Sequence, residues 1–470
     1  MPRSLLILLA MAYMLGGCAS NPVRVPEAAA VPGAWSSAVS TAATSGAQAS
    51  TAWWKELGDS ELDDIIATAL ETNADVSVAA TRVRQARALT GEARAARQPR
   101  LDMGDSAARE RVPKSFVRDP DGVRSTVPAT RQSRFSSQVE ARYEIDLLGR
   151  LALGEKAAAA DLDASEADLR AVKQWLVQEV ILIYADLRLA EDRATVASDA
   201  EVALERLLAA EQERLKAGLI GRERLRDAER QMADKRDEMI AIGHERHAAR
   251  ARLAGLAGKA PVEVEVRSHE HYFGQLVISG AVTADLPAVV IEQRADVAAA
   301  WHRVLAANHQ AERTRLERYP SLTLTGNLGF VSASIRRWLT GDALAWVAQV
   351  VLSEPLLDGG RARARGDQAI AVMDEQFALH RKVVLQALVE VETTLSAAQA
   401  GKSRVDLAET ELARRLADRD AADRALAAGI NSRPSLLQAE LALLAATDTV
   451  SLRRHELLGA WVNAQKALGR

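Results

Sequence analysis

One stretch of the sequence occurs twice in the chain. ADVSVAATRVRQA begins at Ala74 and ADVAAAWHRVLAA begins at Ala295, and seven of the thirteen positions are identical without a gap. A long-period repeat of this kind means that a chain is built from copies of one structural unit. The sequence therefore predicts an internal duplication, and each copy must fold in the same way.

Further landmarks extend the repeat over most of the chain. Pro99 recurs as Pro320 at the same separation, and two later pairs recur ten residues sooner than that separation predicts. Those pairs are Gly149–Arg150 with Gly360–Arg361, and Ala217–Gly218 with Ala428–Gly429. One insertion between Pro99 and Gly149 explains the change of offset. We expect a first copy over 61–255, a second over 285–470, and a connector over 256–284.

Each copy predicts a helical segment followed by a β-hairpin. Apolar residues recur every three or four positions over about 60–97 and 285–317, as in an amphipathic helix. Alternating stretches then predict hairpins over about 100–145 and 321–354, with turn-rich segments at 113–129 and 334–342. In FSSQVEARYEI the apolar positions are Phe135, Val139, Ala141, Tyr143 and Ile145. Each strand has about the length that a tilted strand needs to cross a bilayer.

One of these strands is irregular. In RLDMGDSAARERV, Arg109 and Arg111 have the same parity as Leu101 and Met103. Either the arginines lie beyond the apolar part of the strand, or the strand ends before them.

A very long helical hairpin follows each β-hairpin. The segments 151–217 and 361–428 contain no proline, and each predicts a helix of roughly 100 Å at 1.5 Å per residue. Ala-Gly ends each helix, and shorter helices are predicted over 222–255 and 433–468, with Pro434 in a first turn that tolerates it. A hairpin of this length requires neighbouring helices, which predicts an assembly of several copies.

Composition and motifs argue against an enzyme. The charge is nearly balanced at −3, which excludes the basic footprint of a nucleic-acid-binding protein, and only 4% of residues are aromatic. HERH at 244–247 does not match a zinc-binding pattern, and GLAGKA at 255–260 lacks the spacing of a phosphate-binding loop. We identify no catalytic residues, no metal site and no enzymatic activity.

The N-terminus resembles a bacterial lipoprotein signal. Residues 1–17 contain one cation and a short apolar run, and LGG precedes Cys18, the single cysteine. This pattern resembles the lipobox, which implies N-acyl and S-diacylglycerol lipid on Cys18 and no other cofactor. Ala19 and Ser20 favour the outer membrane under the sorting rule of such lipoproteins. The alternative is an ordinary signal peptide with a chance cysteine.

Membrane insertion, if it occurs, must use strands. Beyond the signal the sequence has no run of about 18 apolar residues. Four strands are too few for a closed barrel, since bacterial barrels begin at eight. A membrane-spanning form therefore requires an oligomer whose subunits pool their strands.

The ordered motifs resemble the outer-membrane factors of tripartite efflux systems, the TolC-like channels, and specifically their NodT-type lipoprotein branch. The motifs are WWKELGDSELDDII, YEIDLLGR, AGLIGRERLRDAE, LPAVVIEQRADVAAA, YPSLTLTGNLG and AGINSRPSLLQAE. The resemblance implies an α+β homotrimer, in which a 12-stranded outer-membrane β-barrel continues into a long periplasmic α-helical barrel. It also implies that 18–60, 256–284 and the extreme C-terminus form an equatorial region.

The same resemblance implies a function and partners. The chain is expected to be a passive exit channel for small molecules, coupled through a periplasmic adaptor to an inner-membrane RND-type pump, in contact with outer-membrane lipids. The alternative is a periplasmic helical-hairpin adaptor or structural lipoprotein, which leaves the paired alternating stretches unexplained.

Two sets of site residues follow from the resemblance. The adaptor-docking tips map onto the two helix breaks, at Ala217, Gly218, Leu219, Ala428, Gly429 and Ile430. The other interpretation of these breaks is that they are only helix caps. The candidates for a periplasmic gate are Asp227, Arg433, Ser435, Gln438 and Glu440. Known members carry acidic residues where this chain has Ser435 and Gln438, so negative charge here would come from Asp227 and Glu440, and Arg433 is a candidate latch.

Overall fold

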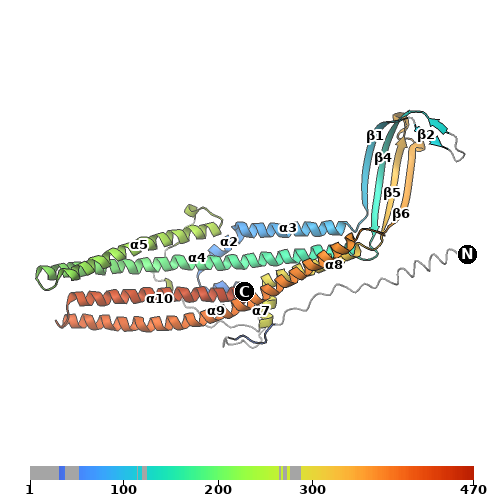
Figure 1. Ribbon diagram of the computed structural model, residues 1–470. Coiled ribbons are helices and arrows are strands. Elements are labelled where there is room, and N and C mark those ends of the chain that lie inside the picture. The colour runs from blue at the N-terminus through green and yellow to red at the C-terminus, as the bar shows by residue number, and fades with distance from the viewer. Residues whose placement is uncertain are drawn as a thin grey trace. The chain divides into compact units, whose positions relative to one another are not determined.

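The computed structural model describes residues 31–36, 52–113, 115–118, 124–263, 266–267, 272–275 and 287–470. The expected signal peptide at 1–17 and the lipidation site Cys18 lie outside the described residues, as does much of the expected connector and of the segment 18–60. The two copies of the repeat are drawn in Figure 1 with their elements labelled.

The order of elements repeats from one copy to the other, so the duplicated hairpin-plus-long-helix fold predicted from the sequence is confirmed (Figure 1). After the 3-10 helix η1 (Trp53–Leu57), the first copy contains α2 (Ser60–Thr72), α3 (Ala74–Ala95), β1 (Arg100–Val112), β2 (Ser115–Arg118), β3 (Arg124–Val127), β4 (Thr130–Ile145), α4 (Arg150–Lys216) and α5 (Arg222–Leu256). The short elements η2 (Pro261–Glu263) and α6 (Tyr272–Gln275) lie between the copies. The second copy contains α7 (Pro287–Gln293), α8 (Ala295–Leu316), β5 (Ser321–Ser332), η3 (Ile335–Arg337), η4 (Gly341–Ala343), β6 (Leu344–Ser353), α9 (Arg361–Ala427) and α10 (Arg433–Ala467).

The described chain divides into two compact units. One comprises 84–163 and 302–378 and holds the strands with the helix ends that adjoin them. The other comprises 52–83, 164–301 and 379–470, together with 31–36, and holds the hairpins of long helices and the main hydrophobic core. None of the helices in the described ranges is long and apolar enough to cross a membrane.

The strand unit contains an antiparallel sheet with the order β1-β4-β5-β6. Directly paired residues share a face, and the register aligns apolar residues across the sheet: Met103 pairs with Val139, Val139 with Leu328, and Leu328 with Trp346. The opposite face carries polar residues such as Gln138. The alternation predicted from the sequence is therefore an apolar face and a polar face of one sheet.

The irregular first strand runs its full predicted length. All thirteen residues of β1 pair with β4, including Arg109 opposite Ser133 and Arg111 opposite Arg131. The arginines therefore lie on the apolar face but beyond its apolar part, which decides between the two alternatives.

The turn-rich segment 113–129 differs from expectation because it contains the two-stranded ribbon β2–β3. The helical segments 60–97 and 285–317 also differ, because each is broken. The breaks fall at equivalent positions, Asn73 and Arg294. The Asn73 carboxamide oxygen accepts hydrogen bonds from the N–H groups of Asp75 (2.8 Å) and Val76 (3.2 Å), so it caps a new helix.

In each copy, a side chain at the break between the first two helices donates a hydrogen bond to the end of the last helix. The Asn73 Nδ2 donates to the Leu256 carbonyl oxygen (3.0 Å), and the Arg294 Nη1 donates to the equivalent Ala467 carbonyl oxygen (2.7 Å). Gly258 and Gly469 follow in left-handed conformations at equivalent positions. A Cβ on Gly258 would lie 2.7 Å from the Thr72 carbonyl oxygen, so only glycine permits this approach.

Close packing of β4 against β5 leads to the first prediction. A Cβ on Gly329 would lie 2.1 Å from the Ser137 carbonyl oxygen, whereas a Cβ on Gly326 would meet no atom closer than 3.7 Å. Gly329→Ala is therefore expected to destabilise the sheet by about 1–3 kcal/mol through overpacking. Gly326→Ala is the matched control in the same strand. Thermal unfolding of the purified protein should show a lower midpoint for Gly329→Ala alone, and equal midpoints would contradict the packing described here.

Candidate functional site

The tips of the two helical hairpins have the same backbone structure. After α4, the N–H of Leu219 donates to the Arg214 carbonyl oxygen (2.9 Å) and the N–H of Gly218 donates to the Leu215 carbonyl oxygen (3.0 Å). After α9, Ile430 and Gly429 make the equivalent bonds, at 2.9 and 3.0 Å. Both glycines have φ near +70°, so both helices end in a Schellman motif that requires glycine at this position.

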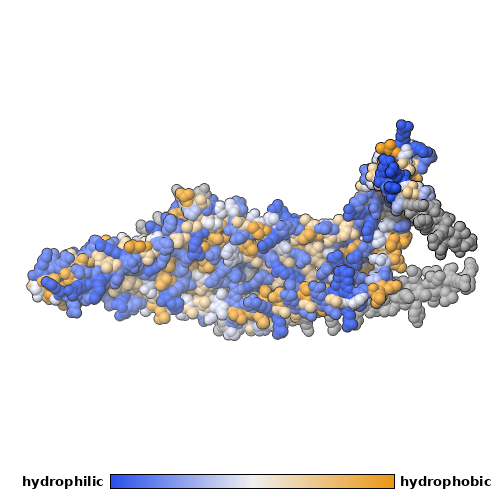
Figure 2. Space-filling model, turned by 45° about the horizontal axis from the view of Figure 1, so that its top comes forward, coloured by the Kyte–Doolittle hydropathy of each residue, from blue (hydrophilic) through white to orange (hydrophobic). Residues whose placement is uncertain are grey.

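The residue after each glycine is an exposed apolar side chain. Such a residue usually packs back on its own helix in this motif. Here Leu219 is 70% exposed and Ile430 is 84% exposed. In Figure 2 the end of the helical hairpins at the left of the view is mainly hydrophilic, with few hydrophobic residues. The tips are helix caps, and each also presents one exposed apolar side chain.

The gate candidates lie within the first eight residues of α5 and α10, after the tips. Asp227 forms an ion pair with Arg230 on its own helix. Ser435 Oγ lies 3.0 Å from Ser432 Oγ, which places it in the start of α10. Arg433 and Gln438 are exposed, and Glu440 is partly exposed. Among the described residues of one chain, no ion pair joins Arg433 to Asp227 or Glu440.

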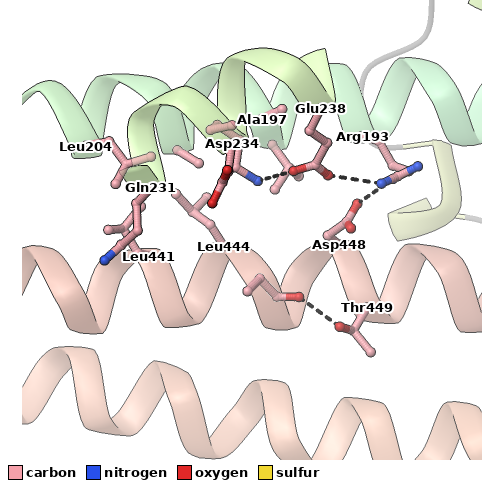
Figure 3. Close-up of a pocket in the computed structure, with 14 residues that line it drawn as sticks. Arg193, Ala197, Leu204, Gln231, Asp234, Glu238, Leu441, Leu444, Asp448 and Thr449 are labelled. Carbon is pink, nitrogen blue, oxygen red and sulfur yellow. Dashed lines mark hydrogen bonds and ion pairs between the residues drawn. The ribbon is translucent and has the colours of Figure 1, made fainter. Parts of the chain in front are cut away.

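Sequence reasoning missed an ionic cluster farther along the same helices (Figure 3). Arg193 on α4 contacts Glu238 on α5 (3.0 Å) and Asp448 on α10 (3.2 Å). A cavity of about 490 Å³ adjoins this cluster, with Leu204, Leu441 and Leu444 in its wall. One guanidinium therefore ties three helices from both copies together.

The two acids of this cluster have pKa values shifted in opposite directions. Burial raises the pKa of Asp448, and Arg193 only partly opposes that effect. A hydrogen bond from Lys235 (2.5 Å) holds the pKa of Glu238 below its usual range. The sequence gives no signal for this cluster, because Arg193, Glu238 and Asp448 are far apart along the chain.

The apolar face of the sheet is exposed in the single chain. Trp346 is 71% exposed, Val350 68% and Met103 71%, and all three belong to the face that the register aligns. Exposed apolar surface of this extent marks a site of contact with a membrane or another protein. Strands β1 and β6 lie at the two edges of the sheet, and each pairs with one neighbour in the described chain.

Comparison with known proteins identifies the family. The model of the outer membrane efflux protein family matches residues 65–259 and again 286–470, one match for each copy of the repeat. The chain belongs to the outer membrane efflux protein family. It is an outer-membrane protein and a component of an efflux pump, and the family is made of channel proteins. This assignment favours the channel over the adaptor considered from the sequence.

The relatives align with most of the chain. The pyoverdine export outer membrane protein OpmQ of Pseudomonas aeruginosa is 27% identical over 466 residues, covering 99% of this chain and 96% of OpmQ. The outer membrane protein OprJ of the same species is 29% identical over 390 residues, covering 83% and 79%. The structure of the outer-membrane channel OprN superposes with a TM-score of 0.82 at 24% identity, covering 96% and 98%. This last similarity concerns the fold.

Proposed function

We propose that three copies of this chain assemble into a passive exit duct for small molecules. Each subunit contributes four strands to a 12-stranded barrel, which continues into a helical tunnel made of six duplicated hairpins. The exposed apolar face of the sheet carries this proposal, together with the edge strands β1 and β6 that remain available for pairing with neighbouring subunits. Twelve strands exceed the eight with which bacterial barrels begin.

The duct is proposed to serve an RND-type pump of the inner membrane through a periplasmic adaptor. We assign no enzymatic activity and no metal to the chain itself, and the pump supplies the energy. The N-acyl and S-diacylglycerol groups on Cys18 are proposed to add a lipid anchor. Asp227, Arg433, Ser435, Gln438 and Glu440 are proposed to surround the periplasmic mouth, close to the docking tips.

The assembly is tested by measuring the particle mass of detergent-extracted protein by light scattering. Three times the mass of the mature chain is the expected result. A monomer or dimer that stays soluble without detergent after Cys18→Ser would overturn the channel and support the adaptor.

The tips give a prediction for function. Leu219→Asp combined with Ile430→Asp is expected to abolish export, because a carboxylate at each exposed apolar point prevents burial against the adaptor. The measurement is ethidium accumulation in the native host, which should rise to the level of a strain that lacks the gene.

The matched control is Leu407→Asp on α9, since Leu407 is 71% exposed and lies within the helix away from the tip. The control is expected to export normally, and all variants should retain the trimer mass. Normal export by the tip variant would show that these residues are only helix caps.

A further inference from the structure

The turn between β6 and α9 carries an unusual sequence of exposed side chains. Leu356 is 89% exposed and Leu357 is 94% exposed, and Arg361, Arg363 and Arg365 follow within nine residues. Adjacent leucines at this exposure gain nothing from the packing of their own chain. The segment therefore presents an apolar group and a cationic group side by side.

The arginines oppose the electrostatics of their own helix. The first turn of α9 contains no acidic residue, and cations near a helix N-terminus are unfavourable. The N–H groups there already have a partner, since the Asp358 carboxylate accepts from Gly360 (2.9 Å) and Ala362 (2.7 Å). These bonds lower the pKa of Asp358 and keep it ionised. An anion in this place would thus be bound by the arginine side chains and not by the helix terminus.

Two of the arginines have no ion pair in the described part of the chain. Arg365 reaches Glu317 at 3.4 Å, whereas Arg361 and Arg363 are exposed and reach no carboxylate. Other arginines near the same end of the sheet are paired: Arg94 and Arg97 both bind Glu155, at 2.9 and 2.6 Å. The positive charge of Arg361 and Arg363 is therefore available to an external anion.

The first copy of the repeat lacks this cluster. Arg361, Arg363 and Arg365 correspond to Arg150, Ala152 and Gly154. Arg150 is bound to Glu144 at 2.6 Å. The space beside Gly154 is filled by the Arg313 guanidinium, 3.3 Å from where a Cβ would lie. The fold of a copy does not need the additional arginines, so they serve something specific to the second copy.

The order of side chains matches the layers of a bilayer. The apolar face of β6 ends at Leu352, the exposed leucines follow at 356 and 357, and the free arginines follow at 361 and 363. If the sheet crosses the membrane, this order corresponds to the hydrocarbon core, the part of the acyl chains next to the headgroups, and the headgroups themselves. Arginine binds phosphate well because its planar fork matches the phosphate oxygens.

We propose that the β6–α9 turn binds an anionic phospholipid of the leaflet beside it. The phosphodiester lies on Arg361 and Arg363, and Leu356 and Leu357 enter the acyl-chain region. The proposal rests on the membrane-spanning sheet of the proposed function, and it adds a preference for lipid charge that the apolar face does not provide.

The test is native mass spectrometry of the delipidated trimer titrated with phosphatidylglycerol or with phosphatidylcholine of the same acyl chains. The full chain is expected to prefer phosphatidylglycerol, and added salt should reduce the preference. Arg361→Ala with Arg363→Ala should weaken phosphatidylglycerol binding about twenty-five-fold, at about fivefold per cation, and should weaken phosphatidylcholine binding less, because the choline cation offsets the phosphate charge of that lipid. Arg94→Ala with Arg97→Ala is the control, because those arginines are already paired, and it should retain the preference.

Three results would overturn the proposal: no lipid preference in the unaltered trimer, an equal loss in the control, or dissociation of the trimer by the Arg361 and Arg363 variant. The last would assign the turn to contact with a second copy of the chain. Failure of the unaltered protein to form a trimer would instead overturn the proposed function.

Discussion

Replacing Arg188 by methionine is expected to destabilise the helical unit by about 3 kcal/mol, because it breaks a buried ion-pair network. Glu61 loses this cation, and Glu191 keeps its ion pair with Arg250 (2.9 Å). Arg188 on α4 is fully buried. Its guanidinium donates to Glu61 (2.6 Å) and Glu191 (2.8 Å), and also to the Arg267 carbonyl oxygen (2.5 Å). The residue therefore links α2, α4 and the segment between the two copies.

Aromatic rings enclose the same guanidinium. It lies 4.5 Å from the Tyr184 ring centroid, and the Tyr184 hydroxyl accepts from it (2.7 Å) and donates to Asp59 (2.6 Å). Burial, with the hydrogen bond to Asp59, raises the pKa of Tyr184, so this hydroxyl stays protonated over the physiological range. Loss of Arg188 thus disturbs a network in which every member depends on the others.

The measurement is thermal unfolding of the detergent-solubilised protein, together with limited proteolysis. Arg188→Met should lower the midpoint and make the chain at Arg267 more accessible to cleavage. Arg236→Met is the control, since Arg236 is 59% exposed and its pair with Glu201 is a surface pair worth about 0–1 kcal/mol. Indistinguishable midpoints for the two variants would show that the buried network does not stabilise the helical unit.

Arg294→Met is expected to cost about 1–3 kcal/mol near neutral pH, since it leaves several polar partners unsatisfied. The Arg294 guanidinium contacts Asp296 (2.8 Å), Glu390 (2.6 Å) and the Ala467 carbonyl oxygen (2.7 Å). Both acids are partly exposed, so the expected loss is smaller than for Arg188. Arg294→Lys should recover part of the lost stability, because lysine keeps the positive charge but lacks the planar, forked set of donors of the guanidinium.

The pH dependence of this variant has a definite sign. Burial alone would raise the pKa values of Asp296 and Glu390. Hydrogen bonds and positive charge outweigh burial and hold both pKa values below their usual range: Arg294 acts on Asp296, and Lys466 (2.7 Å) together with Arg294 acts on Glu390. The contribution of the pair is therefore present above the ordinary carboxyl pKa of about 4 and is lost as the pH falls through the depressed values.

Without Arg294, burial remains and the lowering of both pKa values should be reduced, although Lys466 still contacts Glu390. The variant therefore loses less stability than the unaltered protein as the pH falls, so the difference in midpoint should be largest near pH 7 and narrow toward about pH 4. A difference that widens on acidification would contradict this assignment of the charges.

Repetition in the sequence made the fold predictable. Periodicity alone indicates a helix or a strand. The recurrence of Pro99 as Pro320 and of Gly149 as Gly360 also predicted that the same elements follow in the same order in both copies. The β2–β3 ribbon was missed because SFVR and RSTV are short, although the Asp-Pro-Asp-Gly between them is a known turn signal. The break at Asn73 was missed because apolar periodicity continues on both sides of the cap.

The tips were predictable and the ionic clusters were not. Ala-Gly followed by an apolar residue is a local signal for a Schellman motif, and both tips form it. Arg188 and Arg193 lie within a long helix, and Arg294 lies at the break between α7 and α8. Most of their charged partners are distant along the chain, up to 255 positions for Arg193 and Asp448. Only the packing of the helices brings such charges together.

In each copy, residues near the start contact residues near the end, and this contact is relevant to how a duplicated chain arises. In the first copy Asn73 meets Leu256 and Thr72 meets Gly258, and in the second Arg294 meets Ala467 beside Gly469. The start and end of a copy are thus adjacent in space, which is the property that lets protein units be joined in tandem or reordered. A gene for one such unit needed only a linker to become a gene for two. Once doubled, the equivalent positions were free to diverge, and an amide at 73 and a guanidinium at 294 now perform one structural task with different sensitivity to acid.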